Sequence, residues 1–202
     1  MARERSISIP ISSPCSTGKA DIQSKPGYEI PAELEKILSG SVYIRTTLTR
    51  RDGTPRTIET TFVWASGSDR IVISGYPGKR DWMASMSRNP NVTVHTVEFE
   101  PWFDIAAEAR MIRDLDEKLP RVMAFIENWT QRPGFPRTRF RLLLGAVKLN
   151  RALRLPWWGP FIIAKRIFSG MPCVEITFVG EPARRDTGGP PGLSEPQEGR
   201  PY

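Results

Sequence analysis

The stretch 74–94, which begins Ser74-Gly75-Tyr76-Pro77-Gly78-Lys79-Arg80-Asp81-Trp82-Met83, decides the fold of this chain. It follows the short apolar run 70–73, which is typical of a strand. Its glycines and proline allow a sharp turn, and the apolar spacing of Trp82, Met83 and Met86 predicts a short helix. Asn89-Pro90 ends this helix, because the residue before a proline avoids helical backbone angles. Alternating residues after it predict the next strand.

Two cations stand where the expected helix begins. The free N–H groups and the dipole of a helix N-terminus favour an anion. Lys79 and Arg80 can add charge-assisted hydrogen bonds to such an anion. The stretch therefore predicts a phosphate cradle, and the alternative interpretation is a solvated basic turn between two strands.

Composition excludes several classes of protein. The chain has 202 residues, which is typical of one domain. Its two cysteines, Cys15 and Cys173, allow no disulfide framework and no zinc site, and both are predicted to be inert. The single histidine, His95, lies mid-strand and gives little support to Ser-His-Asp or multi-histidine metal chemistry, so no metal is expected. No apolar segment has the length of a signal peptide or a spanning helix, and we expect a cytoplasmic location.

Periodicity along the chain predicts more strands than helices. Residues 1–28 and 181–202 are expected to be a flexible N-terminal tail and a disordered C-terminal tail around one domain, 29–180. The predicted class is mainly β (α+β): a small barrel of about six antiparallel strands with peripheral helices. Strands are expected at 42–48, 57–65, 70–73, 91–98, 102–112 and 174–179, and helices at 31–38, 82–88, 114–128 (interrupted by Pro120) and 137–155.

The positive charge is concentrated in one segment. The net charge is +7, and the chain from 128 to 174 contains no Asp or Glu. The expected helix 137–155 has an apolar stripe of Leu142, Ala146, Leu149 and Leu153. An anionic partner is therefore expected in this region. Its nine cations are Arg132, Arg137, Arg139, Arg141, Lys148, Arg151, Arg154, Lys165 and Arg166.

The order of elements from 31 to 179 resembles the split β-barrel flavoproteins typified by pyridoxamine-phosphate oxidase. The resemblance is greatest to the deazaflavin-dependent nitroreductase and quinone reductase branch. That branch commonly has a Lys-x-x-Trp followed by an Asn-Pro, and Lys79, Trp82 and Asn89-Pro90 occupy these places. The hairpin 52–57 and the closing pattern 172–176 are similar too.

The resemblance implies a set of cofactor-binding residues. Lys79 and Arg80 would hold the phosphate of a deazaflavin coenzyme (F-420 type) or of FMN, and Trp82 would pack beside the ring system or brace the turn. Tyr76 and Ser74 are candidates to hydrogen-bond a substrate. The remaining residues of the implied cradle are Thr60, Thr61, Ser74, Gly75 and Arg56.

The chain departs from the family pattern in two places. The family often has His-Pro where this chain has Arg80-Asp81, and the basic helical insertion at about 132–170 is longer than the usual connection. Three interpretations of the insertion remain open: it covers the barrel with its apolar stripe, it binds the acidic tail of a deazaflavin, or residues 137–166 contact the inner face of an anionic membrane. No nucleic-acid motif is visible, and nucleic acid is not an expected partner.

Three hypotheses for function follow. The first is an oxidoreductase that passes hydride from a reduced deazaflavin, or FMN, to a quinone, a nitro-compound or an enone. The second is a protein that binds such a cofactor without turnover. The third is a membrane-surface protein with a vestigial cradle. A monomer and a homodimer are both compatible with the resemblance.

Overall fold

The computed structural model describes residues 30–78, 80–130, 137–185 and 187–194, and every structural statement below refers to these residues. Lys79 lies outside them, as does the predicted tail 1–28. The elements are α1 (Ala32–Gly40), β1 (Tyr43–Thr49), β2 (Pro55–Trp64), β3 (Arg70–Ser74), α2 (Asp81–Arg88), β4 (Asn91–Thr96), β5 (Trp102–Met111), α3 (Leu115–Trp129), α4 (Arg137–Ala152), α5 (Pro160–Gly170), β6 (Cys173–Phe178) and β7 (Ala183–Arg185).

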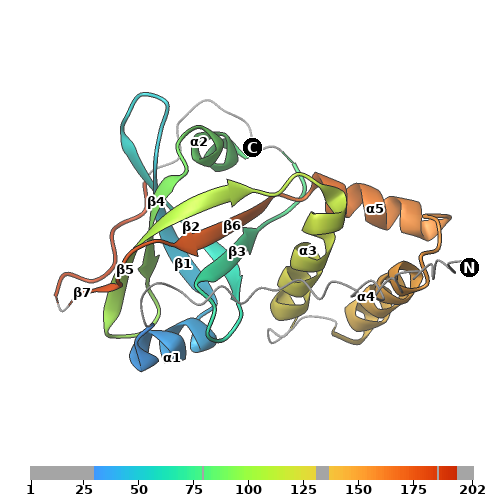
Figure 1. The fold of residues 1–202 in the computed structure, drawn as a ribbon, viewed down its shortest axis with the longest axis horizontal. Helices are drawn as coiled ribbons and strands as arrows, with labels where there is room; N and C mark the ends of the chain where they lie inside the picture. Colours follow the sequence, from blue (N-terminus) through green and yellow to red (C-terminus); the bar gives the residue numbers. More distant parts are fainter. Residues whose placement is uncertain (1–29, 79, 131–136, 186, 195–202) are drawn as a thin grey trace, which may run out of the picture.

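Six of these strands close into an antiparallel barrel in the order β1-β2-β3-β6-β5-β4 (Figure 1). The pairing of β4 with β1, in which Thr46 faces Val94, closes the barrel. The predicted α+β class and the antiparallel barrel of about six strands with peripheral helices are therefore confirmed. The Asp-Gly hairpin between β1 and β2 also forms, and Gly53 supplies the positive φ of 85° that its turn needs.

Alternation along the strands fills the barrel interior. In β1, Ile44, Thr46 and Leu48 are buried while their neighbours are exposed or half-buried. Ile73 and Ile176, from β3 and β6, are fully buried in the same cluster. Such alternation places every second side chain on the inner face, which is why the strand pattern was readable from the sequence.

A second apolar cluster lies outside the barrel, beneath α3. Leu119 and Val122 of α3 pack there with Val147 of α4 and Phe168 of α5. Figure 1 shows α3 between the barrel and α4, with α5 leading back to β6. Within the described part of the chain, no helix is long and apolar enough to cross a membrane.

Pro120 does not interrupt α3, contrary to the sequence-based expectation. The helix is continuous over its 15 residues. Proline has no N–H to donate to the carbonyl four residues earlier, which here belongs to Asp116. Arg151 of α4 donates to that carbonyl oxygen from its Nη2 at 3.0 Å. The carbonyl that Pro120 leaves without its helical donor is therefore satisfied by a side chain from another helix.

The apolar stripe of α4 faces solvent instead of the barrel. Leu142, Leu149 and Leu153 are exposed by 70%, 60% and 59%, while the buried residues described in this helix are Leu144, Val147 and Asn150. The interpretation that the stripe Leu142, Ala146, Leu149 and Leu153 covers the barrel is therefore wrong. The helix packs through two apolar positions between the stripe residues, and a period of 3.6 residues does not show which of two apolar sides is buried.

The segment 181–194, part of the tail expected to be disordered, contains β7. This three-residue strand pairs with β5, with Phe103 opposite Arg184. The N–H of Thr57 donates to Ser194 Oγ at 2.9 Å. Sequence periodicity gave no sign of β7, because three residues are too few to show alternation.

Candidate functional site

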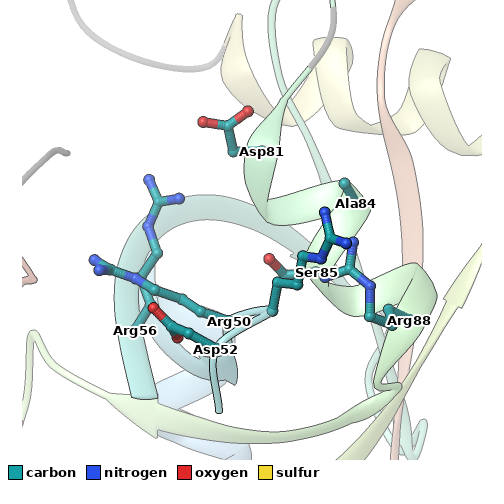
Figure 2. A pocket seen from close by; sticks show the side chains of 8 residues that line it. Arg50, Asp52, Arg56, Asp81, Ala84, Ser85 and Arg88 are labelled. Atoms are coloured by element: carbon teal, nitrogen blue, oxygen red, sulfur yellow. The ribbon is translucent and has the colours of Figure 1, made fainter. Parts of the chain in front are cut away.

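A cavity of about 540 Å³ lies between the β1–β2 hairpin and α2. The hairpin is closed by the N–H of Arg50 donating to the carbonyl of Thr54 at 2.8 Å. Figure 2 shows Arg50 and Arg56 on the hairpin side of the cavity and Ser85 and Arg88 on the α2 side. The lining residues are Arg50, Arg51, Asp52, Arg56, Asp81, Ala84, Ser85 and Arg88.

This cavity is suited to an anion. Four arginines line it against two aspartates. The carboxylate of Asp52 is occupied by Thr54, whose N–H and hydroxyl donate to it at 2.9 and 2.6 Å. These hydrogen bonds lower the pKa of Asp52, which keeps it in its turn-forming ionised state. Arg50 Nε is buried and has no hydrogen-bond partner among the described residues, which leaves a donor for a bound anion.

A second cavity, of about 900 Å³, lies on the other side of α2 and shares Asp81, Ala84 and Arg88 with the first. It contains three further cations, Arg80, Arg113 and Lys118. The Nζ of Lys118 donates to the Ser169 carbonyl at 3.0 Å, which holds the side chain of this buried lysine at the C-terminal end of α5. The positive potential therefore continues along α2.

A third cavity, of about 310 Å³, is apolar and lies between the end of β3 and helices α3 and α5. Tyr76 and Trp129 meet edge to face at its margin, with ring centroids 6.3 Å apart. Met171 lines both this cavity and the second one, so each cavity shares lining residues with the next, from the arginine-rich cavity to the apolar one. The lining residues are Thr61, Gly75, Tyr76, Pro77, Phe125, Ile126, Trp129, Ile167 and Met171.

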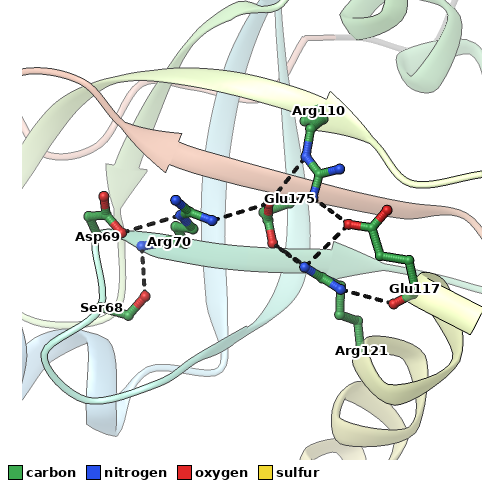
Figure 3. Close-up of polar contacts among 7 residues, drawn as sticks. All are labelled: Ser68, Asp69, Arg70, Arg110, Glu117, Arg121 and Glu175. Atoms are coloured by element: carbon green, nitrogen blue, oxygen red, sulfur yellow. Dashed lines mark hydrogen bonds and ion pairs between the residues drawn. The ribbon is translucent and has the colours of Figure 1, made fainter. Parts of the chain in front are cut away.

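An ion-pair network holds α3, which forms one wall of the apolar cavity, against the barrel (Figure 3). Glu175 of β6 is buried and accepts hydrogen bonds from Nη2 of both Arg110 and Arg121 at 2.8 Å. Arg121 belongs to α3, so the bond joins the helix to the sheet. Burial alone would raise the pKa of Glu175, but the hydrogen bonds from Arg110 and Arg121 outweigh it, and the pKa is lowered.

The structure distributes the predicted site residues over the three cavities. Arg56 lines the arginine-rich cavity. Arg80 lines the second cavity and precedes α2 at its N-cap position. Thr61, Gly75 and Tyr76 line the apolar cavity. The functions assigned to these residues stay predictions.

Three predicted residues do not line these cavities. Ser74 is buried, and its hydroxyl donates to the Pro172 carbonyl at 2.6 Å, so it is engaged in joining β3 to β6. Thr60 lies on the barrel-core face of β2, opposite to that of Thr61. Trp82 packs against the barrel core. The predicted phosphate ligand Lys79 lies outside the described residues.

Sequence reasoning missed Arg50, Arg51 and Arg88. A signal was present, because Arg50 and Arg51 directly precede the Asp-Gly turn and Arg56 follows it, so that a tight hairpin brings all three together. Phe125 and Trp129 of the apolar cavity gave no local signal. Their helical spacing shows one face of α3 but not what that face meets.

His95 lies outside this site, in a chain of hydrogen bonds within the barrel wall. Its Nε2 lies 2.8 Å from the hydroxyl of Thr47, and its Nδ1 lies 2.5 Å from Asp104. A carboxylate only accepts, so Nδ1 carries the proton and the Thr47 hydroxyl donates to Nε2. The sequence of contacts Thr47–His95–Asp104 resembles that of a hydroxyl–histidine–carboxylate catalytic triad, but none of the three residues lines any of the three cavities. No cluster of His, Cys, Asp or Glu among the described residues can hold a metal ion.

The protein thus has an α+β fold built on a closed, six-stranded antiparallel barrel, with an arginine-lined cavity and an apolar cavity on either side of a second cationic one. No family model matches the chain, and no curated protein matches its sequence. Among solved structures, the chain is similar to a protein proposed to confer 5-nitroimidazole antibiotic resistance in Bacteroides thetaiotaomicron (12% identity; 75% of this chain and 81% of that chain; TM-score 0.49).

Two further structures are similar in the same range. A proposed pyridoxamine 5'-phosphate oxidase from Listeria innocua is 13% identical, with 77% of this chain and 97% of that chain covered and a TM-score of 0.48. An F420 reductase is 15% identical, with 76% of this chain and 98% of that chain covered and a TM-score of 0.46. Because the identities to these structures are only 12–15%, the function proposed below is argued from the residues of this chain and not from the similar structures.

Proposed function

We propose that this barrel binds a phosphate-bearing cofactor of the flavin type, either a deazaflavin coenzyme or FMN, and acts as an oxidoreductase. The observation that carries the proposal is the path of adjoining cavities, which is cationic at one end and apolar at the other. An elongated molecule with a phosphate at one end and a ring system at the other has the same distribution of polarity. Hydride chemistry would be supplied by the bound cofactor, while the protein orients it and excludes water.

The residues present fit such a cofactor. Arg50, Arg56 and Arg88 would hold the phosphate, because guanidinium groups match phosphate oxygens in geometry and charge. The unpartnered, buried Nε of Arg50 supports this assignment directly. The apolar cavity, with the aromatic rings of Tyr76 and Trp129 at its margin, would take the ring system.

The second cavity does not distinguish between the two cofactors. Its cations Arg80, Arg113 and Lys118 lie in the cavity that shares lining residues with both the arginine-rich and the apolar cavity. The acidic tail of a deazaflavin coenzyme leaves the phosphate on the side away from the ring system, so cations between the two ends do not favour it over FMN. We therefore propose either cofactor, with a quinone, a nitro-compound or an enone as the hydride acceptor in the apolar cavity.

Cofactor binding without turnover is the second candidate. The observation that favours it is the absence of a charged side chain from the described lining of the apolar cavity. Its polar side-chain groups are the hydroxyls of Thr61 and Tyr76 and the indole N–H of Trp129, none of which carries a charge. Oxidation of the reduced, bound cofactor by a water-soluble quinone separates the two candidates, because a pure binding protein gives no acceleration over the free cofactor.

Titration of the full chain with FMN and deazaflavin, followed by absorbance and fluorescence, tests the proposal. Replacing both Arg50 and Arg56 by Ala should weaken cofactor binding by at least roughly 100-fold, since a hydrogen bond to a charged group contributes about 1.5–3 kcal/mol. Lys36→Ala is the matched control, because Lys36 is an exposed cation on α1 and lines none of the three cavities. Equal affinity of the double variant and wild type for both cofactors would refute the phosphate assignment.

A further inference from the structure

Helices α4 and α5 expose large apolar side chains on the part of the molecule that projects beyond α3 (Figure 1). Six of these side chains are each 55–70% exposed. In a monomeric protein, exposed apolar residues that gather in this way mark an interaction site. We call this set the hairpin face: Leu142, Leu149, Leu153, Trp158, Ile162 and Ile163.

The hairpin face is distinct from the side through which the two helices pack. On α4, Leu144 and Val147 are buried, and on α5, Ala164 and Phe168 are buried. Each helix therefore has a second apolar side in addition to the one that contacts α3 and its neighbours. Packing among the described residues does not bury this second side, which leaves it available to a partner.

Cations surround the hairpin face and acids are missing from it. Arg141, Arg154, Lys165 and Arg166 are exposed and form no ion pair within the described part of the chain. No Asp or Glu occurs from 128 to 174. A second copy of this face would bring like charges together, which opposes self-association. An anionic surface complements the face in charge as well as in polarity.

We propose that the hairpin face binds peripherally to an anionic lipid bilayer. Leu and Ile side chains of an amphipathic helix enter the boundary between headgroups and acyl chains, and Trp158 suits the interface itself. The long side chains of Lys and Arg extend to lipid phosphates while their stems stay in contact with apolar surface. An anionic bilayer thus satisfies both kinds of side chain.

The hairpin face adjoins the apolar cavity of the barrel. Ile167 of α5 is 46% exposed and also lines that cavity. Docking would therefore hold an apolar cavity next to a reservoir of lipophilic molecules. The docking inference itself does not depend on the proposed function, because it uses only residues of α4, α5 and the turn that joins them.

Flotation of the full chain with vesicles tests the inference. Wild type should float with vesicles of phosphatidylcholine and phosphatidylglycerol but only poorly with phosphatidylcholine alone, and salt should weaken the binding. Each cation near an anionic surface changes partitioning by about fivefold. Lys165→Gln with Arg166→Gln should therefore lower partitioning by roughly 25-fold, and Leu149→Gln with Leu153→Gln should lower it for both vesicle types.

Matched controls use similarly exposed residues that lie outside α4, α5 and the turn that joins them. Val179 and Leu193 are 58% and 52% exposed, and their replacement by Gln should leave flotation unchanged. Lys36→Gln with Arg184→Gln removes the same charge as the cation variant. Circular dichroism and thermal melting confirm that each variant is folded.

Three outcomes would overturn the inference. The first is wild type that stays with the unbound fraction at low salt. The second is equal flotation of the hairpin variants and wild type. The third is a wild-type dimer in ultracentrifugation without lipid that Leu149→Gln with Leu153→Gln converts to a monomer, which would identify the hairpin face as an interface between copies.

Discussion

Replacing Glu175 by Gln should destabilise the protein by about 2–4 kcal/mol. Glu175 is 5% exposed and accepts four hydrogen bonds, at 2.8 and 3.3 Å from Arg110 and at 2.8 and 3.1 Å from Arg121. Glutamine keeps the shape but removes the charge and points its N–H₂ group at one of the two guanidinium groups, because Oε1 faces Arg110 and Oε2 faces Arg121. Breaking a buried pair costs roughly 3–5 kcal/mol. The destabilisation that we expect for Glu175→Gln is smaller because the side chain of Arg110 is 52% exposed and can hydrogen-bond to water in the variant.

Urea unfolding and calorimetry measure this effect. For a chain of this size, 1 kcal/mol shifts Tm by about 2–4 °C, so Tm should fall by roughly 5–15 °C. Glu117→Gln is the matched control, because Glu117 contacts the same two arginines but its side chain is 37% exposed. Its loss should stay below about 1 kcal/mol. Equal losses for the two variants, or a loss below about 1 kcal/mol for Glu175→Gln, would refute the reasoning.

The same variant has a defined pH dependence. The folded-state pKa of Glu175 is lowered, so its contribution is complete above the ordinary value of 4.5 and is lost as pH falls through the lower folded value. The difference in unfolding free energy between wild type and Glu175→Gln should therefore be constant near neutral pH and shrink below pH 4.5. A difference that grows on acidification would contradict the assignment.

Two further predictions concern buried titratable groups. Burial, followed by the charges of Arg185 and Arg45, lowers the pKa of His95 to about 4, so the NMR signal of the single histidine should titrate far below its usual midpoint of 6.5. Between pH 6.5 and about 4, His95 takes up a proton in the unfolded chain but not in the folded protein, so the free energy of unfolding should fall as the pH is lowered through this window. An NMR midpoint near 6.5 would contradict the lowered pKa. Burial raises the pKa of Cys173 to about 11. In a Cys15→Ser variant at pH 8, a thiol reagent should therefore react with Cys173 only as fast as the protein opens. Reaction within the mixing time would show an accessible thiolate and contradict this prediction.

The barrel could be predicted from the sequence because its signals are local. The Asp-Gly hairpin, the alternation in β1 and the Asn-Pro end of α2 each lie within a few residues. These local signals predict which segments are helices and which are strands, and most of their boundaries. Short connections between successive strands then predict that those strands pair antiparallel.

The site was only partly predictable because its members come from distant segments. Arg56, Thr61 and Tyr76 were proposed from motif and resemblance; each lines a cavity, and the functions assigned to them stay predictions. Ser74 was assigned to the cradle, but its hydroxyl is taken by the carbonyl of Pro172, 98 residues away. The carbonyl of Asp116, which Pro120 leaves without its helical donor, is likewise satisfied by Arg151, which no local pattern connects to it.

The closing of the barrel by β6 has a consequence for how the chain folds. β3 pairs with β6 across the whole segment that contains α4 and α5, with Ile73 opposite Val174. Contacts of such separation carry a loop-closure cost before they return any stability, so closure should be slow, in the range of milliseconds to seconds. During synthesis, β3 and β5 present unpaired edges until residue 178 has emerged. A newly made chain is therefore exposed to intermolecular strand pairing for most of its translation, and its yield in a cell should depend on chaperones that cover those edges.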